Sequence, residues 1–116
     1  MALVPDVGER EIAKRINSTG TKPDWIASGT GTTAESETQT ALITEVESRV
    51  QGTASNPQDA RYQVVGQITY TATRAITEAG LFDANTSGNM YVRGVFSAIN
   101  VVSGDKIEFT IQIDIT

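Results

Sequence analysis

Two closely spaced carboxylate pairs, Glu35 with Glu37 and Glu45 with Glu47, are the side chains of this sequence with the most obvious capacity for chemistry. Two carboxyl groups held at a fixed separation across a sugar cleft can hydrolyse a glycosidic bond, one as the acid and the other as base or nucleophile. No assisting motif accompanies these acids, however, and the chain is short for a sugar cleft. We therefore interpret them as solvated surface or subunit-contact charges, with hydrolysis of a surface polysaccharide as a minor alternative.

Two short loops resemble fragments of ligand-binding motifs. The run Gly29-Thr30-Gly31 resembles part of a phosphate-cradling turn, but it lacks the Gly-Lys-Ser/Thr ending of a P-loop and the third glycine of a dinucleotide fingerprint. Residues 83–88 carry oxygen-bearing side chains before a glycine, as in the first half of a calcium loop, but Gly94 stands where the bidentate glutamate belongs. We interpret the first as a flexible loop and the second as a hairpin turn, and we expect neither a cofactor nor a metal.

The absence of cysteine and histidine from the 116 residues removes most catalytic and metal-binding chemistry. Without cysteine there is no thiolate nucleophile, disulfide or iron–sulfur ligand, and without histidine the commonest general base and transition-metal ligand are missing. A Ser-His-acid triad cannot be built, and no Ser-x-x-Lys motif is present. The sequence therefore predicts no enzyme, no catalytic residue and no small-molecule substrate.

The charge pattern argues against nucleic acids and membranes as partners. The net charge is −5, and apart from the adjacent Lys14 and Arg15 the basic residues are scattered singly, whereas a phosphate-binding surface needs clustered cations. No apolar run approaches the roughly 20 residues of a membrane span, and acidic residues occupy the N-terminal stretch where a signal peptide would be apolar. We expect a protein that is made in the cytoplasm and whose partners are other proteins.

The elements that position these residues begin with a short helix. Residues 5–18 have acids in the first turn and bases in the last, which suits the helix dipole, and Ile12 and Ile16 form a narrow apolar stripe. A helix this short is marginal alone, so we expect it to dock, either within its own domain or on a neighbouring subunit. Residues 1–23 then form a helix or arm, and residues 24–116 form the β-sandwich of what is a single domain.

Alternation of apolar and polar residues predicts strands through the C-terminal half. Residues 61–73 and 107–115 alternate most regularly. Residues 75–83 and 90–96 flank a turn cluster at 84–89, which predicts a hairpin. Strands with one apolar face and one Thr/Gln face indicate a mainly β fold, specifically an antiparallel β-sandwich.

Weaker signals precede these strands. Residues 24–28 predict a short strand that runs into the loop at residues 29–33. Residues 34–47 carry four glutamates without a basic partner, and we expect a helical turn around residues 40–43 whose acidic side faces solvent.

Large aromatic and aliphatic side chains are the best candidates for protein contacts, because aromatic residues bury much area at little entropic cost. Trp25 suits an interface and the core equally well. The two threonines of the glycine loop lie in a segment that we expect to reach toward neighbouring subunits. The candidate interface residues are Ile12, Ile16, Trp25, Thr30, Thr32 and Tyr91.

Several segments of the sequence resemble small phage structural proteins of the capsid-decoration and tail-fibre type. The segments are residues 24–34, 40–45, 49–53, 62–66, 76–83 and 96–107. The resemblance covers residues 24–116, and the run Thr77-Glu78-Ala79-Gly80-Leu81-Phe82 is its most specific part. It implies a virion protein with no catalytic residue to carry over, and it fits heads and tails alike.

The leading hypothesis is a phage capsid decoration (cement) protein, made in the host cytoplasm and bound to the outer surface of the head. It would assemble as a homo-oligomer, with a trimer favoured, bridge subunits of the major capsid protein and stabilise the shell by mass action. Residues 2–18 and 19–34 would reach across to the capsid. The alternative is a tail-fibre or adsorption-apparatus component whose loops, especially residues 85–89, bind a glycan or receptor on the host surface.

Overall fold

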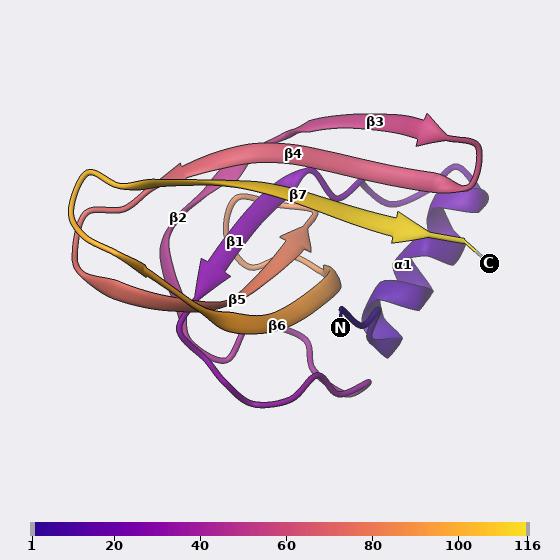
Figure 1. The fold of residues 1–116 in the computed structure, drawn as a ribbon. Helices are drawn as coiled ribbons and strands as arrows, with labels where there is room; N and C mark the ends of the chain where they lie inside the picture. Colours follow the sequence, from indigo (N-terminus) through magenta and orange to yellow (C-terminus); the bar gives the residue numbers. More distant parts are fainter. Residues whose placement is uncertain (1, 116) are drawn as a thin grey trace.

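The computed structural model describes residues 2–115 and contains two antiparallel sheets and one helix (Figure 1). The four-stranded sheet has the order β2-β1-β5-β6, and the three-stranded sheet has the order β3-β4-β7. The elements are α1 (Asp6–Ile16), β1 (Trp25–Gly29), β2 (Glu45–Gln51), β3 (Thr53–Gln58), β4 (Arg61–Thr69), β5 (Arg74–Phe82), β6 (Met90–Val101) and β7 (Lys106–Asp114). The predicted mainly β, antiparallel sandwich is confirmed.

The core lies between the two sheets and comes mainly from the alternating residues of the long strands. In β4, Val64 and Ile68 are buried, and in β7, Phe109 and Ile113 are buried. All four belong to the same cluster as buried residues of the four-stranded sheet. The alternation therefore predicts the core correctly except for Ile115, which lies beyond the end of β7 and is 61% exposed.

The chain passes from one sheet to the other at Gly52, between β2 and β3. The N–H of Gly52 donates to the carbonyl oxygen of Asp24 at 2.7 Å. A Cβ at this position would lie 2.4 Å from Cγ1 of Val64, so a glycine is needed for the chain to pass so close to the core. The two strands on either side lack regular alternation, and the sequence did not predict them individually.

The connection between β1 and β2 is irregular and contains no helix. The helical turn expected around residues 40–43 is therefore wrong. The physical reason is a competing acceptor: the backbone N–H groups of Ile43 and Thr44 donate to the carboxylate of Glu78 in β5, instead of to earlier carbonyl groups of their own segment.

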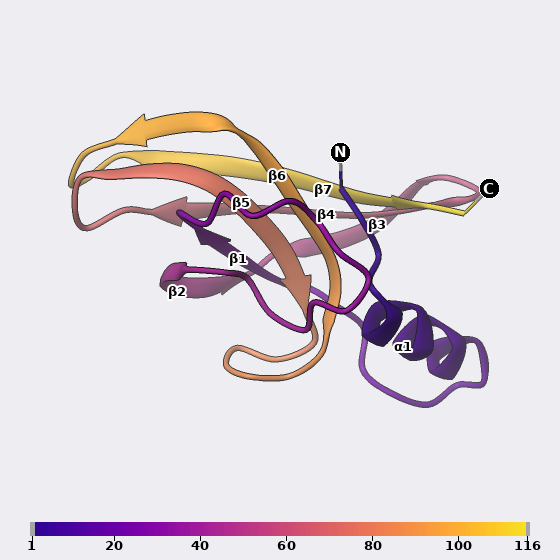
Figure 2. The same ribbon diagram turned by 90° about the horizontal axis from the view of Figure 1, so that it is seen from below.

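Helix α1 lies at one end of the sandwich and packs on β6 (Figures 1 and 2). The approach is close, because a Cβ on Gly8 would lie 2.4 Å from the carbonyl oxygen of Tyr91. Just before the helix, Leu3 and Arg93 exchange backbone hydrogen bonds of 2.8 and 3.0 Å. The N-terminal segment thus packs on its own domain, although Ile16 at its end is 84% exposed. Within residues 2–115, no helix has the length and apolar character that a membrane crossing requires.

Candidate functional site

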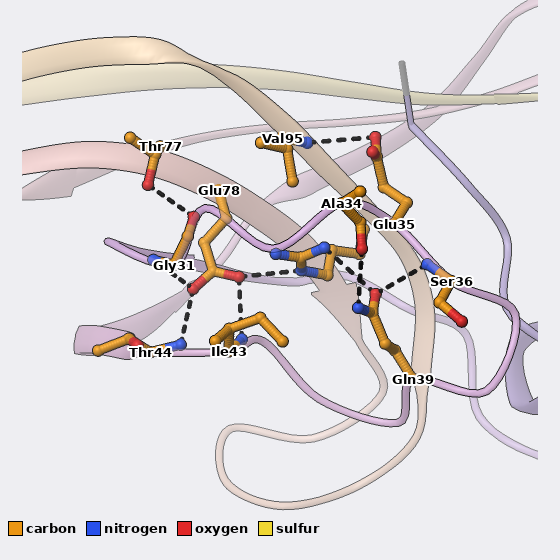
Figure 3. Close-up of polar contacts among 11 residues, drawn as sticks. Gly31, Ala34, Glu35, Ser36, Gln39, Ile43, Thr44, Thr77, Glu78 and Val95 are labelled. Carbon is orange, nitrogen blue, oxygen red and sulfur yellow. Dashed lines mark hydrogen bonds and ion pairs between the residues drawn. The ribbon is translucent and has the colours of Figure 1, made fainter.

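A buried carboxylate organises the connection between β1 and β2 (Figure 3). Oε2 of Glu78 accepts the backbone N–H groups of Gly31 at 2.9 Å and Thr44 at 2.8 Å. Oε1 accepts the N–H of Ile43 at 3.0 Å and Nε of Arg93 at 2.9 Å. The side chains of Glu78 and Arg93 are 0% and 1% exposed, so this is a fully buried ion pair with charge-assisted hydrogen bonds on both oxygens.

The environment keeps Glu78 ionised. Burial raises the pKa of its carboxyl, but the N–H groups of Thr44 and Ile43, the Arg93 guanidinium and the N–H of Gly31 together lower that pKa by more. Arg93 also donates through Nη1 to Oε1 of the Gln39 side chain at 3.2 Å, whereas its buried Nη2 has no hydrogen-bond partner within residues 2–115.

The glycine loop is therefore held in place and is not the flexible loop that the sequence predicts. Besides the bond from Gly31 to Glu78, the hydroxyl of Thr77 donates to the carbonyl oxygen of Gly31 at 2.7 Å. The likeness to a phosphate cradle has a physical basis, since a backbone N–H of this loop does bind an anionic group. That anion is the protein's own carboxylate, which fills the position a ligand would take.

The two candidate threonines of this loop do not share one environment. Thr30 is half-buried, and its N–H donates to the carbonyl oxygen of Thr44 at 3.0 Å. Thr32 is exposed. Neither of them lines the groove or the cleft described below.

The second carboxylate pair, Glu45 and Glu47, is engaged in ion pairs, whereas in the first pair Glu35 accepts the N–H of Val95 at 3.4 Å. Glu45 forms an ion pair with Arg49, whose Nε lies 2.9 Å from Oε2. Glu47 accepts the N–H of Thr71 and pairs with Arg74, and these contacts lower the pKa of its carboxyl. The expectation of unpartnered, solvated charges is wrong for Glu47, whose side chain is only 9% exposed, because its partner Arg74 comes from a strand that is distant in the sequence.

The calcium-like loop is a hairpin turn, as predicted. Oδ1 of Asp83 accepts the N–H of Asn89 at 2.8 Å, and Oδ2 accepts its Nδ2 at 3.0 Å. The turn joins β5 to β6, with Ser87 and Gly88 in the left-handed region. In the described part of the chain, no three acidic side chains come together as a metal site would require.

Three of the candidate interface residues meet in one apolar groove of about 390 Å³ between α1 and the end of the three-stranded sheet. We call it the helix groove. Its apolar walls are Ile12, Ile16, Pro23, Tyr62, Tyr91, Ile113 and Ile115. The sequence thus predicts Ile12, Ile16 and Tyr91 as contact residues, and the fold brings them together from α1 and β6.

The two tyrosines hold one wall of the helix groove in position. The hydroxyl of Tyr62 donates to the carbonyl oxygen of Pro23, and the hydroxyl of Tyr91 donates to that of Thr21, both at 2.7 Å. Burial raises the pKa of each tyrosine to about 12, so both hydroxyls remain donors at neutral pH. The loop between α1 and β1 is thereby tied to both sheets, and the groove is already formed in the free chain.

The charged residues that line the helix groove are basic, whereas the chain as a whole is acidic. Arg15 and Lys22 are the charged residues that line it, and among the described residues no carboxylate joins them there. A hydrogen bond of 3.1 Å from Nη1 of Arg15 to the carbonyl oxygen of Gly20 orients the Arg15 side chain. The helix groove is therefore a basic, apolar depression in a chain whose net charge is −5. Such a surface suits an aliphatic side chain that is flanked by carboxylates.

Trp25 lies elsewhere, and it belongs both to the core and to the surface. It packs against a buried cluster that includes Phe82 and Met90. It also lines a second cleft, between β2 and the turn at residues 84–89. We call this second depression the tryptophan cleft.

The sequence reasoning missed the most deeply buried charges, Glu78 and Arg93. A signal for both was present, since each is the one charge in the interior of its strand segment, Glu78 within residues 75–82 and Arg93 within residues 90–101, and the neighbouring residues are almost entirely apolar or small. Such a charge is buried only when it is paired, which predicts that the two strands meet. β5 and β6 are indeed neighbours in the sheet.

Comparison with known families gives one assignment. The family model described as Podophage GP4 fiber I protein gp80 matches residues 15–115, a range that includes every strand of the structure. Comparison with curated proteins finds no match, and comparison with solved structures finds none either. Because the family model covers most of the sequence, this chain belongs to the podophage fibre protein family and is a phage virion structural protein of the fibre type.

Proposed function

We propose that this chain is a non-enzymatic structural subunit of the phage fibre or adsorption apparatus, and that it attaches to another virion protein through the helix groove. The family match over residues 15–115 carries the fibre assignment. The groove supplies a means of attachment, because it is preformed and presents the exposed Ile16 beside apolar walls.

The chemistry of the helix groove defines the partner segment that we propose. An aliphatic side chain would fill the space between Ile12 and Tyr91, and carboxylates on either side of it would face Arg15 and Lys22. A single contact of this size is weak. Repetition of the subunit, with a homotrimer as our favoured assembly, would raise the effective concentration and make the attachment strong.

Capsid decoration, the first hypothesis from the sequence, receives less support than its alternative. The family description names a fibre protein and no head protein. The arm that was expected to bridge capsid subunits packs on β6 through Gly8 and Leu3. A heat-release assay separates the two roles: a fibre subunit predicts that heads without it release DNA at the same temperature as complete particles, whereas a cement protein predicts earlier release.

Two matched variants test the groove itself. Ile16→Ser removes an aliphatic side chain that is 84% exposed at the groove, and Val102→Ser removes one that is 54% exposed in the turn between β6 and β7. Loss of one buried aliphatic contact weakens binding by at least about tenfold. We expect quantitative mass spectrometry of purified virions to show less Ile16→Ser protein and a normal amount of Val102→Ser protein. Equal incorporation of both variants would exclude the helix groove as the attachment surface.

A further inference from the structure

The tryptophan cleft has the composition of a saccharide-binding site. It is about 450 Å³ in volume and lies between β1, β2 and the turn that joins β5 to β6. Polar and apolar surfaces contribute almost equally to it, unlike the helix groove, which is mostly apolar. Its size is within the usual range for small-ligand pockets and suits a disaccharide.

Arg49 fixes the shape of this cleft. Its Nε and Nη2 donate to the carboxylate of Glu45 at 2.9 and 3.1 Å. Its Nη1 donates to the carbonyl oxygens of Ala84 and Ser87 at 2.9 and 2.8 Å, which attaches the turn to β2. The guanidinium carbon lies 3.7 Å from the ring centre of Phe82, and the side chain is only 6% exposed. The cleft is therefore rigid, and the charge of its arginine is already balanced.

Several polar groups of the cleft remain available for a ligand. Ser48, Asn85, Thr86 and Ser87 are exposed, and within residues 2–115 their side chains make no hydrogen bond. Each carboxylate oxygen of Glu45 accepts one hydrogen bond from Arg49 and retains a further lone pair. Hydroxyl and amide groups can donate to and accept from the hydroxyl groups of a sugar, and the carboxylate can accept from them.

Trp25 adds an aromatic side chain to the polar groups of the cleft. It is half-buried and lines the cleft, so its indole offers an aromatic surface beside these polar groups. A pyranose has one face of C–H groups, which are weakly positive, and these pack favourably against the negative face of an aromatic ring. The ring hydroxyls then point sideways, where hydrogen-bonding side chains are needed.

We propose that the tryptophan cleft binds a neutral saccharide. This inference deepens the proposed function and rests on it, since a fibre subunit meets the polysaccharides of the host surface. Neutral sugars are favoured over acidic ones, because Glu45 already neutralises Arg49 and the chain as a whole is negatively charged. The cleft binds the saccharide without cleaving it, because both of its carboxylates are ion-paired, Glu45 with Arg49 and Glu47 with Arg74, and neither is kept as a free acid or base for hydrolysis.

The experiment uses the isolated chain and an array of neutral bacterial oligosaccharides, with uronic acid-containing oligosaccharides beside them. Saccharides that bind are then titrated while tryptophan emission is recorded, because Trp25 is the only tryptophan and reports on the cleft directly. We expect saturable binding of at least one neutral saccharide with a change in emission. Asn85→Ala should weaken this binding by about tenfold, the equivalent of one or two hydrogen bonds.

Asn100→Ala is the matched control, since Asn100 is exposed on β6 outside the cleft. We expect it to bind as the wild type does, and circular dichroism establishes that both variants are folded. The proposal is overturned by an array without a neutral ligand, by preferential binding of the acidic saccharides, or by equal affinity of Asn85→Ala and wild type. None of these results bears on the location of the chain in the virion, so the fibre assignment is tested separately.

Discussion

Glu78→Gln removes the buried charge that holds the β1–β2 connection to the sandwich. The wild-type carboxylate accepts two hydrogen bonds on each oxygen, from Gly31 and Thr44 on one and from Ile43 and Arg93 on the other. Glutamine has nearly the same size but only one acceptor oxygen, and its NH₂ group cannot accept a hydrogen bond. At least two of these four donors therefore lose their partner, one of them buried, and the buried Arg93 loses its counter-charge.

The expected loss of unfolding free energy follows from the hydrogen bonds and the ion pair that the substitution removes. Removal of one partner from a buried ion pair costs about 3–5 kcal/mol, because the remaining charge stays desolvated. A domain of this kind has a total unfolding free energy of about 5–15 kcal/mol, so the substitution removes a third or more of the stability in most of that range. The size of the effect depends on complete burial, and the side chains of Glu78 and Arg93 are 0% and 1% exposed.

Urea unfolding followed by Trp25 fluorescence measures this loss. Asp114→Asn is the control, because it breaks an ion pair with Arg61 that is well exposed to solvent, and we expect almost no shift in its urea midpoint. The wild type should also lose stability as the pH falls through the lowered pKa of Glu78, while Glu78→Gln lacks this acid titration. A similar small midpoint shift for both variants would refute the claim that the buried pair stabilises the fold.

Three further predictions concern other contacts of the structure. Gly31→Ala should destabilise the fold by about 1–3 kcal/mol in urea unfolding, because its Cβ would lie 2.6 Å from Oε2 of the immobile Glu78. Tyr62→Phe should cost about 1 kcal/mol through loss of the hydrogen bond to Pro23. Because the folded-state pKa of Tyr62 is raised to about 12, the wild type should lose stability as the pH rises toward that value, and the variant should lose less. Arg49→Lys retains the charge but not the guanidinium, whose Nη1 donates to the carbonyl oxygens of Ala84 and Ser87 while Nε and Nη2 bind Glu45, so tryptophan emission should shift to the red as the turn detaches.

Five of the strands were predictable from the sequence, most clearly β4 and β7 with their regular alternation, whereas β2 and β3 were not. β4 and β7 each bury one face, so the period of two in their side chains is visible in the sequence. β2 has no fully buried residue, its exposed and half-buried residues do not alternate, and it contains Glu47 with a positive φ, which interrupts the period. β3 is almost fully exposed and contains Pro57, which normally argues against a strand. Both segments form strands because of where they lie in the fold: β2 is an edge strand of the four-stranded sheet, and β3 is an edge strand of the three-stranded sheet.

Three residues of the helix groove were predictable as contact residues from the sequence, but their position side by side was not. Ile12, Ile16 and Tyr91 were predicted as contact residues, yet nothing in the sequence indicates that α1 lies beside β6. That contact depends on Gly8, whose lack of a side chain allows the helix to approach. The ion pair between Glu47 and Arg74 was missed for the same reason, since its partners meet only after the sheets have formed.

The location of the chain in the virion is the most direct test of the proposed function. Cryo-electron microscopy of purified particles, with and without the protein, shows which density depends on it. We expect the missing density in the tail, in fibres attached to the adsorption apparatus, with an unchanged head shell. Density that disappears from the outer surface of the head would contradict the fibre assignment and restore capsid decoration as the function of this chain.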